Sequence, residues 1–284
     1  MSWLMETFGT EKPVIGMIHL PPLPGTALYD DARGMAGIVE SAKRDAEALQ
    51  AGGIGAVMFG NEGDRPYRTK VGPETTAAVA AAVAAVAPGL SVPFGVDVLW
   101  DPRATLAVAK ATGARFAREV FAGLFGGDLG LWETAAGEVF QYRRAIDAQG
   151  VRLLFTINAE FAAPVAPRPI AAVARSVAFS SLPDALCVSG PITGTPAPFE
   201  ELRAAKEAAG ETPVFANTGV RRETIAETLA IADGCIVGTA LKVDGVTWNA
   251  VDPARVRGLM TAAKGMDEPP RRQGAAKDAR RGSD

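Results

Sequence analysis

The chain has very few side chains that bind soft metals or form disulfides: one histidine, His19, and two cysteines among 284 residues. A zinc site of the His and Cys type needs several such ligands, so this composition argues against one. Cys187 and Cys235 each lie within a short apolar run. Because buried free cysteines behave as small hydrophobic residues, we expect two reduced core thiols in a cytoplasmic protein.

Long apolar runs and an excess of positive charge are also missing. The longest quiet stretch, TTAAVAAAVAAVAPGL, is alanine-rich and ends near a proline, which indicates a helix and not a transmembrane segment. The N-terminal residues lack the basic region and apolar core of a signal peptide. The net charge of −3 offers no basic face for nucleic acid. The segment MSWLMETF could pack as a helix under the fold or associate peripherally with a membrane.

Short apolar, β-rich runs alternate with longer helical patterns along the whole chain. The expected strands are 14–20, 56–59, 94–99, 115–120, 152–158, 185–189, 214–216 and 235–237. This alternation is typical of parallel βα units. Eight such units within roughly 250 residues predict an α/β fold of the (β/α)8 TIM-barrel type. An open, doubly wound sheet is the alternative that the same alternation permits.

The expected helices follow these strands, and turn residues support their ends. They are 30–50, 74–87, 103–111, 132–148, 168–179, 198–209, 221–230 and 253–264. Asp101-Pro102 has the chemistry of a helix start, and Gly52-Gly53 that of a helix end. We therefore expect one barrel domain over residues 1–264. The segment 265–284 is rich in Pro, Gly and charge, which predicts a disordered tail.

Two glycine-rich segments need interpretation. GGIGAV has part of the glycine spacing of a dinucleotide-binding loop, but it follows an expected helix and precedes a strand, the reverse of the required order. It is therefore interpreted as a helix-to-strand turn. FAGLFGGDLGLW is long for a βα loop, and it could be either a mobile lid or a packed connection.

Every expected strand ends in a polar residue, and the C-terminal ends of the strands form the active-site face of a TIM barrel. By alternation, His19 shares a face with Ile15 and Met17, Asp97 with Gly95, and Glu119 with Ala117. We predict Asp97, Glu119 and His19 as catalytic residues for proton transfer. The predicted substrate-binding residues are Asn61, Asp64, Asn158, Ser189 and Asn217. With Asp64, the two acidic catalytic candidates could alternatively hold a divalent metal.

The last two strand ends carry the most specific local pattern, FANTGV and DGCIVGTALK. Loops seven and eight of TIM barrels commonly bind phosphate through backbone N–H groups and a short helix. The predicted phosphate-binding residues are Thr218, Gly219, Gly238, Thr239 and Lys242. The second segment resembles the phosphate turn of the tryptophan synthase α-subunit and related barrels. An ordinary glycine turn is the structural alternative.

Four segments together resemble the BtpA family: PVIGMIHLPPLPGT, VMFGNEGDRPY, GVDVLWDP and ADGCIVGTALKVDGVTWNAVD. The resemblance extends to about Lys264. It implies a TIM-barrel fold and, from the family's name, a role in photosystem I biogenesis or stability. The name does not specify a chemical activity.

The residues at the strand ends predict an enzyme of lyase or isomerase type that acts on a phosphorylated, sugar-like metabolite. No cofactor is expected, and a divalent metal is an open alternative. The alternative function, implied by the resemblance, is a non-catalytic factor for photosystem I or membrane-complex biogenesis and stability. In either case we expect a homo-oligomer.

Overall fold

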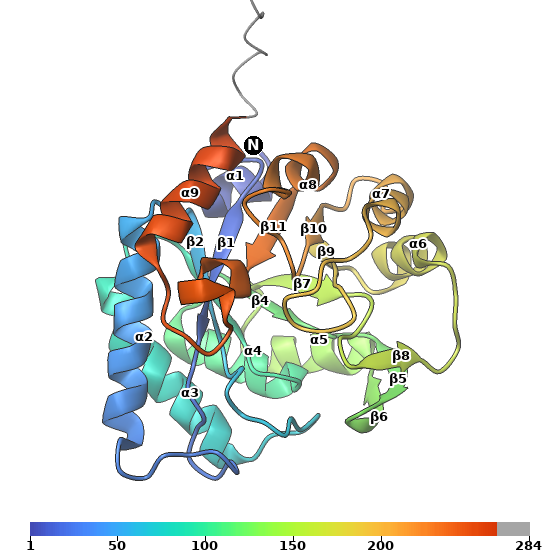
Figure 1. The fold of residues 1–284 in the computed structure, drawn as a ribbon. Helices are drawn as coiled ribbons and strands as arrows, with labels where there is room; N and C mark the ends of the chain where they lie inside the picture. The colour runs from blue at the N-terminus through green and yellow to red at the C-terminus, as the bar shows by residue number, and fades with distance from the viewer. Residues whose placement is uncertain (266–284) are drawn as a thin grey trace, which may run out of the picture.

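The eight expected strands pair in parallel and close into a barrel in the computed structural model, which describes residues 1–265 (Figure 1). In chain order the barrel strands are β1 (Val14–His19), β2 (Ala56–Gly60), β3 (Phe94–Asp97), β4 (Phe116–Glu119), β7 (Arg152–Thr156), β9 (Ala185–Val188), β10 (Val214–Ala216) and β11 (Gly234–Val237). The pairing of Ile15 with Ile236 joins β1 to β11 and closes the barrel. The predicted TIM barrel is therefore confirmed, and the open sheet is excluded.

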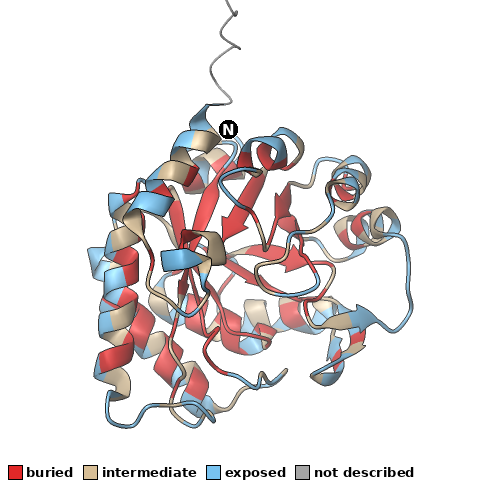
Figure 2. Cartoon of the chain, in the orientation of Figure 1, coloured by how far each residue is buried: buried red, intermediate tan, exposed pale blue. Residues whose placement is uncertain are grey.

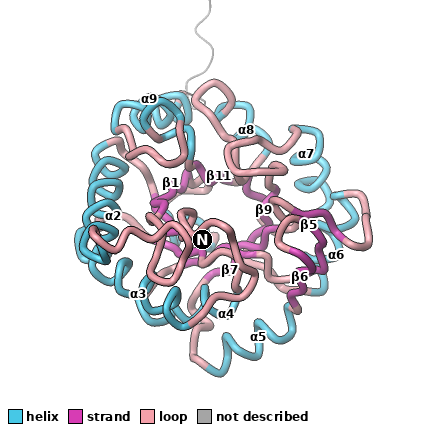
Figure 3. The backbone as a smooth tube through the Cα atoms, turned by 60° about the horizontal axis from the view of Figure 1, so that its bottom comes forward, coloured by secondary structure: helices cyan, strands magenta, loops and turns pink. Residues whose placement is uncertain are grey.

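The helices surround the strands: α2 to α9 form an outer ring, and α1 lies across one end of the barrel (Figure 3). They are α1 (Trp3–Phe8), α2 (Gly34–Ala51), α3 (Pro73–Val86), α4 (Pro102–Thr112), α5 (Ala136–Ala145), α6 (Ile170–Ser180), α7 (Phe199–Ala208), α8 (Ile225–Ile231) and α9 (Pro253–Lys264), with 3-10 turns η1 (Ala87–Gly89), η2 (Thr239–Leu241) and η3 (Val243–Gly245). The Asp101 carboxylate accepts hydrogen bonds from the N–H groups of Arg103 and Ala104, and so starts α4 as predicted.

Alternation along the strands separates two apolar layers, and the strands are buried on both faces (Figure 2). On β1, Val14 and Ile18 pack toward the helices, whereas Ile15 and Met17 point into the barrel. Helix α1 covers the lower end of the interior, where the rings of Phe8 and Phe116 have centroids 5.2 Å apart. The barrel interior is thus filled with side chains below and leaves room only at its upper mouth.

The predicted face of β4 is wrong by one residue. Phe116 belongs to the interior cluster, and Ala117 packs in the layer between sheet and helices. Gly95 on the neighbouring strand makes this register fit, because a Cβ atom there would come within 2.3 Å of the Phe116 ring. Alternation then points Arg118, and not Glu119, into the barrel.

The glycine-rich segment after β4 forms a hairpin, β5 (Gly123–Gly127) and β6 (Gly130–Thr134), which pairs with β8 (Ala162–Pro164). Phe125 and Trp132 lie opposite each other in this hairpin, and Trp132 packs on Trp100 with ring centroids 5.1 Å apart. The segment is therefore a packed connection. The expected helix 132–148 begins only at Ala136, because Trp132 is taken up by the hairpin.

Two other terminal predictions have different outcomes. The expected disordered tail, 265–284, lies outside the described residues except for Gly265, which follows α9. Within residues 1–265, none of the helices combines the length and the apolar character needed to cross a membrane.

Replacing Phe116 by alanine tests the interior packing. The side chain is fully buried and fills the space beside Gly95, so F116A should lower the free energy of unfolding by about 3 to 5 kcal/mol through lost burial and the cavity left behind. Urea denaturation measures this change. The matched control is F179A on α6, where the ring is 88% exposed and the loss should stay within about 0.5 kcal/mol. Equal losses in the two variants would contradict this assignment of the core.

Candidate active site

The mouth of the barrel holds a narrow central cavity of about 30 Å³ beside a larger one of about 530 Å³. Met17 and Ile236 lie at the base of the central cavity, and polar side chains from several loops surround it. The residues that line both cavities are Gly194, Gly219, Gly238 and Thr239. The two cavities are therefore adjacent.

Arg118 is the cation at the centre of this mouth. Its guanidinium lies 3.1 Å from Asp97 Oδ2 and 3.1 Å from Glu160 Oε1, and its Nε donates to Thr156 Oγ1. Only 5% of Arg118 is exposed. Because an arginine stays charged even when buried, the surrounding carboxylates supply the counter-charge that makes its burial tolerable.

Asp97 and Glu119, the two predicted catalytic carboxylates, do not line the central cavity. Both are fully buried. Burial raises the pKa of Asp97 to about 6, while the Arg118 charge opposes that rise. Burial and the neighbouring Asp97 charge raise the pKa of Glu119 well above its usual range. Near neutral pH Glu119 therefore keeps its proton, and Asp97 faces Arg118 as the charged member.

Glu160 is the acidic residue that does reach the central cavity, together with Glu62. Burial raises the pKa of Glu160 to about 7, although the Arg118 charge lowers it. Glu62 Oε1 accepts hydrogen bonds from Tyr67 and Thr193. The sequence analysis missed Glu160 because the search stopped at Asn158, the expected end of the strand. An acidic residue in the loop directly after a barrel strand was the available signal.

Asn217 is the one predicted substrate-binding residue that lines the central cavity. Its Nδ2 donates to Glu160 Oε1 at 3.2 Å and to Ser189 Oγ at 2.6 Å. Ser189 thus holds Asn217 and does not itself face the cavity. Asn158 exchanges two hydrogen bonds with the Ser189 backbone, which ties the ends of β7 and β9 together.

Asn61 and Asp64 serve the loops and not the cavities. Asn61 accepts from Leu99 N and donates to Asp64, whose other oxygen accepts from Leu23 N. These bonds connect the loops after the first three strands. In the part of the chain from residue 1 to 265, no group of three or more His, Cys, Asp or Glu side chains is arranged to hold a metal ion.

His19 lies at the side of the central cavity, against the backbone of Gly238. A Cβ atom at position 238 would approach the imidazole Cε1 to 2.9 Å, so glycine is needed there. Burial, and next the charge of Lys242, lower the pKa of His19 to about 3. The imidazole is therefore neutral near pH 7, and its buried Nδ1 has no hydrogen-bond partner within the described residues.

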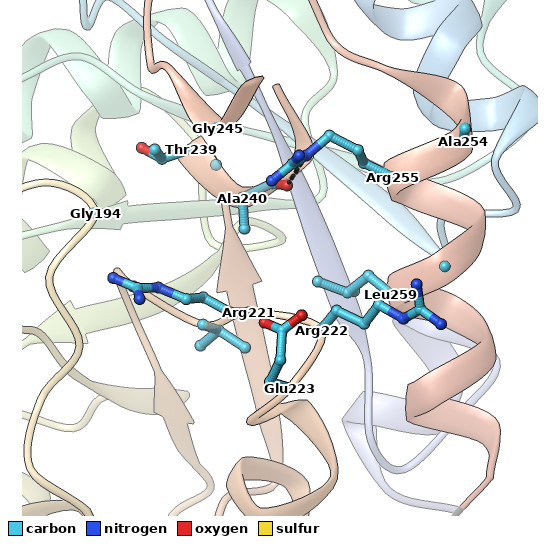
Figure 4. Close-up of a pocket in the computed structure, with 14 residues that line it drawn as sticks. Gly194, Arg221, Arg222, Glu223, Thr239, Ala240, Gly245, Ala254, Arg255 and Leu259 are labelled. Carbon is cyan, nitrogen blue, oxygen red and sulfur yellow. Dashed lines mark hydrogen bonds between the residues drawn. The ribbon is translucent and has the colours of Figure 1, made fainter. Parts of the chain in front are cut away.

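The larger cavity lies between the loops after β10 and β11, where the sequence predicted phosphate binding (Figure 4). Gly219 has φ +62°, and a Cβ atom there would come within 2.1 Å of the backbone nitrogen of Pro196. Gly238 and Thr239 form the opposite wall. The charged lining residues, which the sequence analysis missed, are Arg221, Arg222, Arg255 and Glu223.

Figure 4 shows Arg221 and Arg222 extending toward opposite ends of this cavity, and Arg255 reaching from α9. The Arg255 Nε donates to the carbonyl oxygen of Ala240 at 2.9 Å, which fixes its position beside Thr239. The pair of arginines directly after the TG turn of the seventh strand, in GVRRE, was the sequence signal for this charge.

Thr218 and Lys242, also predicted to bind phosphate, are engaged elsewhere. Thr218 Oγ1 donates to the carbonyl of Thr195 and accepts from Gly190 N. Lys242 is 1% exposed, and its ammonium lies 2.6 Å from the Asp45 carboxylate on α2. Lys242 therefore forms a buried ion pair, and it does not line the cavity of about 530 Å³.

Solved structures with the same architecture include phosphoribosyl anthranilate isomerase from Thermus thermophilus, with 16% identity, a TM-score of 0.55, and coverage of 89% of this chain and 99% of that one. Another is (S)-3-O-geranylgeranylglyceryl phosphate synthase from Thermoplasma acidophilum in complex with sn-glycerol-1-phosphate, with 16% identity, a TM-score of 0.59, and coverage of 93% and 99%. At these identities the likeness concerns the fold.

The sequence is similar to two curated proteins over nearly its whole length. The putative sgc region protein SgcQ of Escherichia coli (strain K12) is 48% identical over 92% of this chain and 97% of that protein. The photosystem I biogenesis protein BtpA of Synechocystis sp. is 33% identical over 94% and 93%. The model of the BtpA family matches residues 10–265. The chain therefore belongs to the BtpA family.

Proposed function

We propose that this protein is an enzyme of lyase or isomerase type that acts on a phosphorylated, sugar-like small molecule. One observation carries the proposal: a cavity lined by three arginines shares the wall residues Gly219 and Gly238 with a central cavity that is lined by Glu160 and Arg118. A phosphate in the larger cavity would present the rest of its molecule to Glu160 in the central cavity. Binding energy from the phosphate would then hold the reacting part in place.

The phosphate would lie beside Gly219, Gly238 and Thr239, where backbone N–H groups and nearby guanidinium groups can donate hydrogen bonds. The cavity lining has three arginines against a single glutamate, so its local charge is positive although the whole chain carries −3. The glycerol phosphate bound by the geranylgeranylglyceryl phosphate synthase supports a phosphorylated substrate for a barrel of this architecture.

Glu160 would exchange the proton with the substrate. A group whose pKa is about 7 is populated in both its acid and its base form at neutral pH, as a general acid or base requires. Glu160 would take a proton from a hydroxyl-bearing carbon next to a carbonyl group and return it to the former carbonyl carbon of the resulting enediolate, while Arg118 stabilises the negative charge on the carbonyl oxygen. Asp97 and Glu119 would act as positioning residues for Arg118, and the neutral His19 would orient a hydroxyl group.

A non-catalytic role in membrane-complex biogenesis is the second candidate, and the name of the Synechocystis relative supports it. Such a factor needs a partner surface, and the sheet of β5, β6 and β8 carries the exposed apolar side chains Leu124 and Leu131. Thermal unfolding with a panel of phosphorylated sugars and sugar acids separates the candidates. Stabilisation by a ligand, followed by turnover that E160Q lowers by about 10²-fold or more, supports the enzyme. Partner association with no effect from any ligand supports the factor.

Removing two arginines should weaken anion binding in the larger cavity. The double variant R221Q/R255Q loses two guanidinium groups there, and each charged hydrogen bond contributes about 1.5 to 3 kcal/mol. Inorganic phosphate should therefore bind at least about tenfold more weakly in isothermal titration calorimetry. The control is R257Q, also on α9 but exposed and outside the cavity, which should bind as the unchanged protein does. Unchanged affinity in the double variant would contradict the phosphate site.

E160Q should flatten the dependence of stability on pH. The pKa of Glu160 is raised from 4.5 to about 7, so the folded protein holds this proton more tightly than the unfolded chain. The resulting stabilisation is complete below pH 4.5 and is lost as pH rises to about 7, by an amount on the order of 3 kcal/mol. E160Q removes this loss, which urea denaturation at pH 5, 6, 7 and 8 measures. E227Q, at an exposed site on α8, should keep the slope of the unchanged protein. The same slope in E160Q would show that Glu160 does not titrate in this range.

A further inference from the structure

A third cavity, of about 270 Å³, lies on the other side of His19, between α2 and residues 242–250. We propose that it binds a second anionic group of the substrate, a carboxylate or a phosphate, so that the substrate is anchored at both ends. This inference rests on the proposed function, because it assumes that the first anionic group occupies the cavity beside Gly219. It narrows the substrate class to small molecules with two anionic groups.

Three arginines give this third cavity its charge: Arg33 before α2, Arg44 within α2, and Arg65 in the loop after β2. Within residues 1–265, none of the three has a carboxylate within ion-pair distance. The remaining charged lining residues, Lys242 and Asp45, neutralise each other in their buried pair. Arg44 donates one hydrogen bond to Ser41 Oγ at 3.1 Å, and its other N–H groups, with those of Arg33 and Arg65, make no side-chain hydrogen bond to the described residues. Such guanidinium donors recognise carboxylate and phosphate.

Trp248 holds one of these guanidinium groups in place. The Arg65 guanidinium carbon lies 3.7 Å from the centre of the Trp248 ring, a stacked cation–π contact. Stacking uses the face of the guanidinium and leaves the N–H groups at its edge free to donate. A long surface side chain is thus ordered beside the cavity without a protein carboxylate. Less side-chain entropy of Arg65 is therefore lost when an anion binds.

His19 is shared by the two sides, because it lines both the central cavity and this one. The imidazole thus lies between the two cavities, and its buried Nδ1 atom has no hydrogen-bond partner within the described residues. Thr239 of the larger cavity and Thr247 of this one lie next to each other, with their Oγ1 atoms 2.9 Å apart, so the two arginine-lined cavities are neighbours. A substrate with hydroxyl groups between its two anionic ends, such as a sugar bisphosphate or a phosphorylated sugar acid, would match this order of groups.

The experiment uses inorganic phosphate as a probe and follows both its binding isotherm and the emission of Trp248. Of the four tryptophans, Trp100 and Trp132 are buried, and Trp248 is 51% exposed in the cavity wall. Calorimetry should resolve two sites, and W248F should remove most of the change in emission on phosphate addition. R44Q should weaken one site at least about tenfold while R221Q/R255Q weakens the other. Arg44 does not stack on Trp248, so R44Q should leave the emission of the free protein unchanged.

R103Q is the matched control, since Arg103 is also stacked on an aromatic ring, that of Tyr142, but lies on α4 away from both cavities. It should bind phosphate at both sites as the unchanged protein does. One site that only R221Q/R255Q abolishes would overturn the inference and leave the proposed phosphate site standing. One site that only R44Q abolishes would overturn the proposed phosphate site instead. Equal weakening by R103Q and R44Q would show nonspecific attraction and would also overturn the inference.

The source of the second anion is then read from the ligand panel. A sugar monophosphate, a sugar bisphosphate and a phosphorylated sugar acid of the same carbon number are compared by thermal unfolding. The sugar bisphosphate and the phosphorylated sugar acid, which each carry two anionic groups, should stabilise the unchanged protein more than the monophosphate does. R44Q should abolish only this additional stabilisation. The ligand that raises the unfolding temperature more shows whether the second anionic group is a carboxylate or a phosphate. Equal stabilisation by all three ligands would contradict a second anionic group.

Discussion

The buried guanidinium of Arg118 is the interaction on which the barrel mouth depends. Removing a charge from water costs several kcal/mol unless partners compensate it, and breaking such a pair leaves an uncompensated charge behind. Asp97 from β3 and Glu160 after β7 both lie 3.1 Å from this guanidinium, which itself comes from β4. The ion pairs therefore fix the upper ends of these strands relative to one another. They also explain why so many acidic groups can be buried together.

The same arrangement sets the protonation states that chemistry would use. Asp97, Glu119, Glu160 and Glu62 form one acidic cluster at the barrel mouth, and burial raises the pKa values of the first three. Glu119 keeps its proton, Asp97 keeps the charge, and Glu160 lies between these extremes with its pKa near neutrality. Only Glu160 and Glu62 among them reach the cavity. Asp97 and Glu119 are thus enclosed by the protein, whereas Glu160 both pairs with Arg118 and lines the cavity.

The sequence predicted what local pattern determines and failed where distant residues decide. Alternating apolar runs were sufficient for the barrel, because each run forms its strand locally. The inward face of β4 depends on how Phe116 packs beside Gly95 of another strand, which no local pattern contains. Lys242 pairs with Asp45, 197 residues away in the sequence, so this buried ion pair could not be predicted from the segment around Lys242 alone. Trp132 joined a hairpin because Phe125 lay opposite it.

His19 shows why one imidazole is sufficient for a site of this kind. A histidine with its ordinary pKa would carry a partial charge near pH 6.5, and such a charge beside Lys242 and Arg118 would be unfavourable. Burial keeps the ring neutral, so it separates two positively charged cavities without adding to the repulsion between them. A neutral ring can also accept a hydrogen bond from a hydroxyl, which an imidazolium cannot. The position therefore favours one neutral polar residue between two arginine-lined cavities, and Gly238 provides the space for its ring.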